Sequence, residues 1–289
     1  MLAAPPAFAT LLALDHPQAR WLPAGHGLGA AWTLGQAWKK AGVRRVVLFP
    51  SSLSSRIAGL VSGARERIGF GGDAEADLGL TRRVPRRLRG ERHLEDEYLD
   101  LAQAAGGNLA PARALTPPEG AASAAASFLP PDAGELLVLA PGARYGPAKR
   151  WPIERFAAVA RAWTRGRAVI VGGKEDAAEG AALASRLGEA GLDLSGRTDL
   201  PALAGVLSRA AAVVSNDSGV AHLAAALGRP TVVVFGSTDP RWTAPRGPSV
   251  RVIWDRVACS PCFRRTCPYV DAYACLRIIG PEQVVAELS

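Results

Sequence analysis

The sequence has few cysteines, few aromatic residues and no long apolar run. Four cysteines in 289 residues are too few for a disulfide scaffold, and they indicate a reduced cytoplasmic setting. No stretch of about 18 uncharged apolar residues occurs, which excludes a membrane-spanning helix. The apolar residues 1–14 have no basic segment ahead of them, so we expect no signal peptide. Scarce aromatics beside abundant alanine and glycine favour closely packed layers of helix on sheet.

Positive charge is concentrated in one short segment of this basic chain, whose net charge is +8. Such a cluster favours a polyanionic partner: nucleic acid, an anionic lipid surface or a phosphorylated substrate. A solvated face is the alternative interpretation. No zinc-finger, helix-turn-helix or aromatic-interleaved RNA signature accompanies the cluster, so we expect no nucleic acid partner. The segment contains Arg82, Arg83, Arg86, Arg87, Arg89 and Arg92.

Short apolar runs alternate with helical patterns along the chain, which predicts an α/β fold with parallel sheets. A Pro/Ala-rich passage at 109–132 has the composition of a linker. We therefore predict a first domain at 1–130, a second at 131–280 and a terminal helix at 281–289. The expected strands are 43–49, 67–70, 135–140, 168–171, 211–214, 231–235 and 250–254, and the clearest expected helices are 31–41, 93–105, 152–163 and 200–209.

Three polar turns follow apolar strands of the second domain, so we expect them at one edge of its sheet. In the first, Lys149 and Arg150 precede a helix start at Pro152. Cations beside free helix amides form an anion site that suits phosphate, although a helix start with solvated charges would have the same residues. In the second turn, Glu175 stands either as a ligand for a ribose hydroxyl pair or as an acid that stabilises the helix dipole. Its Gly172-Gly173 pair lacks both the Rossmann and the P-loop spacing.

The third turn is Asn216-Asp217-Ser218-Gly219, with His222 one helical turn further on. Asp217 or Ser218 is suited to cap the helix that follows. The turn is nevertheless more polar than a cap requires, and with the Gly236–Pro240 turn it suits sugar hydroxyls or a diphosphate. We therefore predict donor-type ligand contacts here.

The four cysteines have the spacing Cys259-x2-Cys262-x4-Cys267-x7-Cys275. This spacing is compact enough for tetrahedral coordination of a structural metal such as zinc. Packed, inert thiols in a loop are the alternative.

Taken together, the segments PGARYGPAKRWP (141–152), NDSGVAHLAAALGRPTVVVFGSTDP (216–240) and ACSPCFRRTCPYVDAYACL (258–276) resemble the ADP-heptose:lipopolysaccharide heptosyltransferases of glycosyltransferase family 9, most of all the heptosyltransferase II group. Segments 48–70 and 93–101 match more loosely. The resemblance implies a GT-B fold, in which two Rossmann-like domains face a cleft. It also implies inverting transfer of heptose from ADP-L-glycero-D-manno-heptose to the phosphorylated heptosyl-Kdo-lipid A acceptor of the lipopolysaccharide inner core, with no cofactor required for catalysis.

The resemblance also assigns roles to individual residues. It implies that Lys149 contacts the donor diphosphate and that Glu175 holds the adenosine ribose. Asp217, Ser218 and Gly219 would line the donor sugar and diphosphate, with His222 nearby. From the charge cluster we add our own inference, that Arg82, Arg83, Arg86 and Arg87 form a face for the anionic acceptor. The predicted location is the cytoplasm, including peripheral contact with the inner face of the inner membrane.

One departure from the family pattern concerns the catalytic base. Family members have an opening strand followed by a Gly-Asp turn, and its aspartate resembles the general base that activates the acceptor hydroxyl. Here no such turn follows an opening strand; Asp15 lacks the glycine, and Gly72-Asp73 comes too late. The sequence therefore predicts an N-terminally truncated, incomplete first domain and leaves the catalytic residue unknown. A base typically contributes about 10²–10⁴-fold, so we expect donor binding with slow or no transfer. A transferase for another nucleotide sugar, and a nucleotide-sugar-binding remnant or sensor, are the alternatives.

Overall fold

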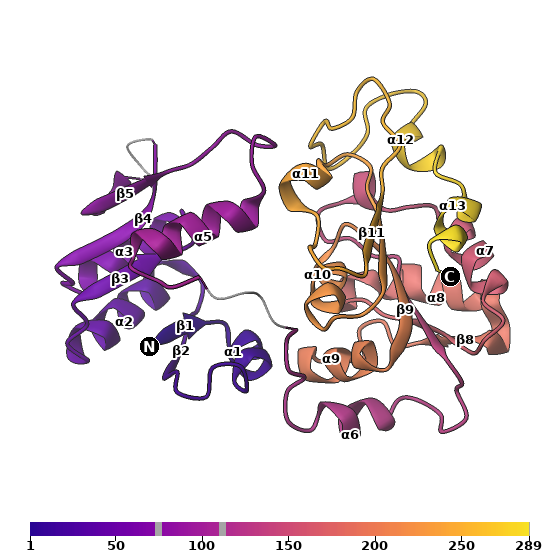
Figure 1. Ribbon diagram of the computed structural model, residues 1–289, viewed down its shortest axis with the longest axis horizontal. Coiled ribbons are helices and arrows are strands. Elements are labelled where there is room, and N and C mark those ends of the chain that lie inside the picture. Colours follow the sequence, from indigo (N-terminus) through magenta and orange to yellow (C-terminus); the bar gives the residue numbers. More distant parts are fainter. Residues whose placement is uncertain (73–76, 110–113, 289) are drawn as a thin grey trace. The chain divides into compact units, whose positions relative to one another are not determined.

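The computed structural model describes residues 1–72, 77–109 and 114–288. The chain folds into two compact units, each built around parallel strands (Figure 1). One unit comprises Met1–Ala9, His16–Ala112 and Arg241–Thr243, and the other comprises Thr10–Asp15, Arg113–Pro240 and Ala244–Ser289. None of the described helices is long and apolar enough to cross a membrane.

The first unit contains a three-stranded parallel sheet in the order β3-β4-β5 and a separate parallel pair, β1-β2. Helix α3 begins with a serine cap, because the Ser52 hydroxyl accepts the amide of Ser55 at 3.3 Å. Helices α2 and α3 pack closely, since a side chain at Gly35 would collide with Ala58 and Val61. The elements are β1 (Leu2–Ala4), α1 (Pro6–Leu12, whose residues from Thr10 on are grouped with the second unit), β2 (Trp21–Pro23), α2 (Gly27–Lys40), β3 (Arg45–Leu48), α3 (Leu53–Val61), β4 (Glu66–Gly71), β5 (Arg82–Pro85) and α5 (Leu94–Ala104).

The second unit contains a six-stranded parallel sheet in the order β11-β10-β9-β6-β7-β8. Its strands are β6 (Leu136–Ala140), β7 (Ala168–Ile170), β8 (Gly191–Asp193), β9 (Ala210–Asn216), β10 (Thr231–Val234) and β11 (Val250–Ile253). Its α-helices are α6 (Ala121–Ala126), α7 (Ile153–Ala162), α8 (Ala177–Leu187), α9 (Leu200–Ser208), α10 (Gly219–Ala226), α11 (Pro240–Thr243, grouped with the first unit except for Pro240), α12 (Ala274–Arg277) and α13 (Pro281–Ala286). Short 3-10 turns occur at Pro147–Lys149, Lys174–Asp176 and Gly188–Ala190.

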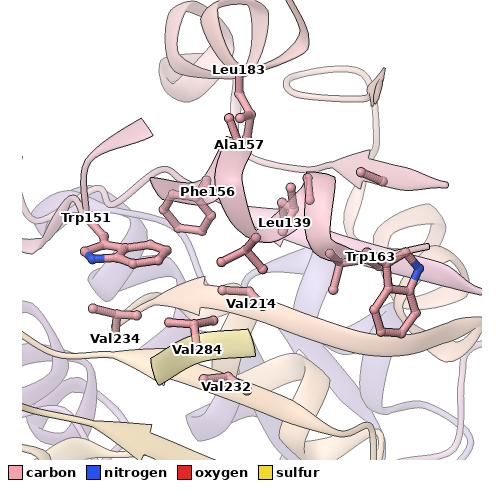
Figure 2. Packing of buried hydrophobic residues seen from close by; sticks show 14 of the residues in the cluster. Leu139, Trp151, Phe156, Ala157, Trp163, Leu183, Val214, Val232, Val234 and Val284 are labelled. Atoms are coloured by element: carbon pink, nitrogen blue, oxygen red, sulfur yellow. The ribbon is translucent and has the colours of Figure 1, made fainter. Parts of the chain in front are cut away.

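Helices cover both faces of this six-stranded sheet. Alternate residues of β6 point to opposite sides, so Leu137 and Leu139 join one core cluster while Val138 joins the other. The first cluster packs Trp151 and Phe156 against the sheet, and Figure 2 shows the Phe156 ring between Trp151 and Leu139. Burial on both faces explains the nearly continuous apolar runs of these strands.

The predicted strands and helices are confirmed, with ends that move by one to a few residues. Pro152 is an exception, because it is the N-cap of α7 and does not lie in its first turn. The linker interpretation of 109–132 was wrong for Ala121–Ala126, which form α6. This short helix packs on α9, where a side chain at Gly205 would collide with the carbonyl of Ala121. Strands β1, β2, β5 and β8 were not predicted, since each is short and lacks a buried apolar run.

Candidate functional site

The polar turns of the second unit gather at one edge of its sheet. Strands β6, β7, β9 and β10 are parallel, so their carboxyl ends lie at the same edge. Ligands of open parallel sheets bind outside this edge. The turns there contain residues 141–152, 172–176, 217–219 and 236–240.

Lys149 and Asp217 meet at this edge from two different turns. The Lys149 ammonium lies 2.5 Å from Asp217 Oδ2, and the side chains are only 13% and 5% exposed. The hydroxyl of Thr238 donates to the same carboxylate oxygen at 2.7 Å. The ammonium also lies 4.9 Å from the centre of the Tyr145 ring, a cation–π contact. This largely buried ammonium, held between a carboxylate and an aromatic ring, is a candidate contact for an anionic group.

Asn216 holds two of these turns together. Its side chain is fully buried; Oδ1 accepts the Trp151 amide at 3.0 Å, and Nδ2 donates to the Pro141 carbonyl at 2.6 Å. The residue was predicted as donor-binding. The structure places it directly beneath the turn that carries Lys149, with both ends of its amide engaged.

The remaining residues of the third turn lie at the start of α10. Ser218 is its N-cap, but its hydroxyl pairs with that of Ser215 at 3.0 Å and does not cap the helix amides. The capping interpretation is therefore wrong for both side chains, since Asp217 pairs with Lys149 and Thr238. Gly219 and His222 are exposed.

Arg150 and Glu175 differ in their surroundings: Arg150 has acidic partners within the protein, whereas Glu175 is exposed. The Arg150 guanidinium pairs with Glu179 and lies 3.9 Å from Asp176 Oδ1. Burial raises the pKa of the Asp176 carboxyl, and the amide of Gly173, 3.0 Å away, opposes that shift. Glu175 is exposed in the turn that follows β7, where its carboxylate is accessible to a pair of hydroxyl groups.

The predicted arginine face lies in the first unit and is not one cluster of free charges. Arg82 donates to the carbonyl of Ala104, and Arg83 pairs with Asp77 at 3.0 Å. Arg86 follows β5 and donates to the Ser51 hydroxyl at 3.2 Å.

Arg86 is further fixed by two contacts. Its Nε lies 3.5 Å from Glu97, and its guanidinium stands 5.4 Å from the centre of the Phe70 ring. Burial raises the pKa of the Glu97 carboxyl, whereas Arg86 lowers it. Arg87 is exposed. Ser51 and Arg86 follow the carboxyl ends of β3 and β5, so they share an edge of the first sheet.

The four cysteines line one small pocket of the second unit, together with Ala148 and Ser237. All four thiols are reduced, and Cys275 is buried while Cys259 is exposed. Within residues 1–72, 77–109 and 114–288, no group of three His, Cys, Asp or Glu side chains is placed to hold a metal ion.

Aspartates discussed as candidate bases have other roles or lie outside the described residues. Both oxygens of Asp15 are engaged by Thr116, at 3.0 Å from its amide and 2.9 Å from its hydroxyl. Asp73 lies outside the described residues.

Sequence reasoning missed Thr238, Tyr145 and Asp176 as individual residues of the site. Each stands in a polar turn at the end of an expected strand, which was the available signal. Their partners lie far away in the sequence, so no local pattern indicated the contacts.

Comparison with known proteins identifies the family. Residues 31–272 match the model of glycosyltransferase family 9, the heptosyltransferases. The chain belongs to this family. Lipopolysaccharide heptosyltransferase 2 of Salmonella typhimurium is 31% identical over 250 residues, which cover 80% of this chain and 72% of that protein. Lipooligosaccharide heptosyltransferase 2 of Haemophilus influenzae is 37% identical over 124 residues, which cover 41% of this chain and 36% of that protein.

The solved structures confirm the predicted fold class. The ADP-heptose lipopolysaccharide heptosyltransferase II of Escherichia coli matches 99% of this chain and 87% of its own, with a TM-score of 0.80 and 26% identity. The family 9 chain is therefore an α/β protein of the GT-B type, with the parallel sheets expected from its sequence.

Proposed function

We propose that this heptosyltransferase homologue transfers heptose from ADP-L-glycero-D-manno-heptose to the phosphorylated heptosyl-Kdo-lipid A acceptor of the lipopolysaccharide inner core. The observation that carries the proposal is the Lys149–Asp217 pair at the carboxyl edge of the second sheet. It supplies a cation for a diphosphate and a carboxylate for sugar hydroxyls within 2.5 Å of each other. Membership of family 9 supports the choice of an ADP-heptose donor.

In this proposal the second domain, residues 131–280 followed by the terminal helix at 281–289, binds the donor. Lys149 binds the diphosphate and stabilises its negative charge as the bond to the sugar breaks. Glu175 accepts hydrogen bonds from the adenosine ribose. Asp217, Ser218 and Gly219 line the sugar and diphosphate.

Three further residues of the proposed donor site act at its margins. Asn216 holds the turn of Lys149 in place through its two backbone contacts. Arg150, which is paired with Glu179, offers its remaining guanidinium N–H groups beside that turn. His222 stands one helical turn beyond Ser218 on α10, near the donor.

The first domain, residues 1–130, is proposed to bind the acceptor through Arg82, Arg83, Arg86 and Arg87. Of these, Arg86 is the best prepared for an anion. It is fixed by Ser51, Glu97 and the Phe70 ring, and a guanidinium has five donors. We assign no residue to the role of general base. We further propose that the protein works in the cytoplasm, in peripheral contact with the inner face of the inner membrane, where such a lipid-linked acceptor would be reached.

A structural metal at Cys259, Cys262, Cys267 and Cys275 is a separate proposal, and none is needed for the transfer itself. The shared pocket of the four thiols supports it, whereas the lack of a metal-holding group among the described side chains opposes it. Elemental analysis of protein purified without chelators decides between these alternatives. One equivalent of metal per chain would support the site, and none would refute it.

The test of the main proposal is transfer itself. The protein is incubated with ADP-heptose and de-O-acylated heptosyl-Kdo-lipid A. The mass of the acceptor is then measured by mass spectrometry. Added heptose together with released ADP supports the proposal. Donor binding with no transfer favours a nucleotide-sugar-binding protein. Transfer from another nucleotide sugar at a higher rate would identify a different donor.

A further inference from the structure

The carboxylate of Asp217 is held by two donors that come from different turns. Lys149, after β6, lies 2.5 Å from Oδ2, and the Thr238 hydroxyl, after β10, donates to the same atom at 2.7 Å. Asp217 and Thr238 are each 6% exposed. A carboxylate this deeply buried requires hydrogen-bond donors, because water cannot replace them.

Thr238 itself is held in place by the cysteine segment, residues 258–276. The Gly236 carbonyl accepts the Ser260 hydroxyl at 2.6 Å. The carbonyl of the next residue, Ser237, accepts the amides of Cys262 and Phe263 at 3.0 and 2.7 Å. Two consecutive carbonyls just before Thr238 are therefore fixed, and the position of its hydroxyl follows from them. A β-branched side chain also has few rotamers, which restricts the hydroxyl further.

Donor binding would change the two partners of Asp217 unequally. A diphosphate at Lys149 competes with Asp217 for the ammonium, since both are anions. The hydroxyl of Thr238 is neutral and is not drawn toward phosphate in this way. Asp217 repels the diphosphate but accepts hydrogen bonds from sugar hydroxyls, so its natural ligand is the sugar.

We propose that Thr238 is a positioning residue of the donor site, whose hydroxyl orients the Asp217 carboxylate toward the hydroxyl groups of the donor sugar. It acts through Asp217 and does not itself touch the substrate. This inference rests on the proposed function, because it assumes an ADP-sugar bound at Lys149. It gives the Gly236–Pro240 turn a role in the choice of donor sugar.

The experiment compares the affinities of ADP and ADP-heptose by titration calorimetry on the full chain. ADP lacks the sugar that Asp217 is proposed to contact, so the ratio of the two affinities isolates the effect. Thr238→Val keeps the shape and removes the donor. We expect it to lower ADP-heptose affinity roughly tenfold, the effect of one hydrogen bond to a charged group, and to change ADP affinity less than about twofold.

Two further variants serve as controls. Thr238→Ser retains the hydroxyl and is expected to restore most of the ADP-heptose affinity. Thr231→Val removes another buried hydroxyl, at the start of β10, where it donates to the carbonyl of Arg229 at 2.8 Å. This variant is expected to keep the wild-type ratio of affinities. Thermal unfolding of each variant is measured alongside.

The outcomes are distinguishable. Wild-type protein that binds neither ADP nor ADP-heptose would refute the proposed function and with it this inference. Wild-type binding of both, with an unchanged ratio in Thr238→Val, would refute the positioning role alone. An equal loss for both ligands would likewise show that the residue serves only the architecture of the turn. If Thr238→Val does not fold, Thr238→Ala is measured in its place. It is expected to show the same change in the ratio of ADP-heptose affinity to ADP affinity.

Discussion

Replacing Lys149 by alanine is expected to weaken ADP binding strongly while the second unit stays folded. The ammonium stands 2.5 Å from Asp217 and is only 13% exposed, so its charge acts in a poorly solvated environment. The variant loses the cation that attracts the diphosphate. It also leaves Asp217, an anion, facing the phosphates without its counter-charge.

The size of the effect follows from the burial of the pair. Truncating one partner of a buried, hydrogen-bonded charge pair costs binding about 2–5 kcal/mol. We take about 2–3 kcal/mol, because Lys149 keeps some exposure, and this is roughly 30- to 140-fold in Kd. The cost to folding is about 3 kcal/mol, because the buried Asp217 carboxylate loses its counter-charge, although the Thr238 hydroxyl still donates to it. A domain with about 5–15 kcal/mol of stability remains folded after that loss.

Titration calorimetry with ADP measures the first quantity, and urea unfolding measures the second. Lys40→Ala is the matched control, because it removes the same charge from the last turn of α2 in the other unit. It should bind ADP as the wild type does. The reasoning would be refuted if Lys149→Ala bound ADP within about threefold of the wild type. A similar loss in Lys40→Ala would show only a general charge effect.

Further predictions concern other residues of the two units. Asn216→Ala should lower the free energy of unfolding by about 2–3 kcal/mol in urea, since it loses two buried hydrogen bonds; a change below about 0.5 kcal/mol would contradict its role between the turns. Glu175→Gln should weaken ADP several-fold but leave 2′,3′-dideoxy-ADP, which lacks both ribose hydroxyls, nearly unaffected, and equal losses would argue against a ribose contact. Burial raises the pKa of Glu97 in the folded protein, so the wild type should lose stability relative to Glu97→Gln as pH rises above the ordinary value of 4.5; urea unfolding at several pH values would show a constant difference if this is wrong. Burial raises the pKa of the Cys275 thiol to about 11, whereas backbone amides lower that of Cys267, so iodoacetamide should modify Cys267 before Cys275, and mass spectrometry showing the reverse order would contradict the structure.

The second unit could be predicted well because its residues carry strong local signals. The run at 211–214 and the run at 231–235 are apolar on both faces, and they form the buried strands β9 and β10. Turns that follow parallel strands lie at the same edge of the sheet. The sequence therefore predicted that Lys149 and Asp217 share one edge, although it could not predict that they form an ion pair.

The sequence could not predict which charged side chains pair with one another, or which helices depend on packing against a distant element. Arg150 is separated from Glu179 by 29 residues along the chain, and nothing local indicates that the two side chains pair. The arginines at 82–92 share a segment, yet Arg82 and Arg83 find different partners because β5 directs successive side chains to opposite faces. Arg86 lies just beyond β5 and pairs with Glu97 of α5. The alanine-rich α6 was missed because its helix depends on packing against α9 and lies in a proline-rich passage.

The measurement that tests the donor site most directly is a titration of the chain with ADP, UDP and GDP and with ADP-heptose. The account predicts that ADP and ADP-heptose bind, that UDP and GDP bind more weakly, and that Lys149→Ala weakens ADP and ADP-heptose together. Equal affinity for all nucleotides, or binding that is independent of Lys149, would contradict it.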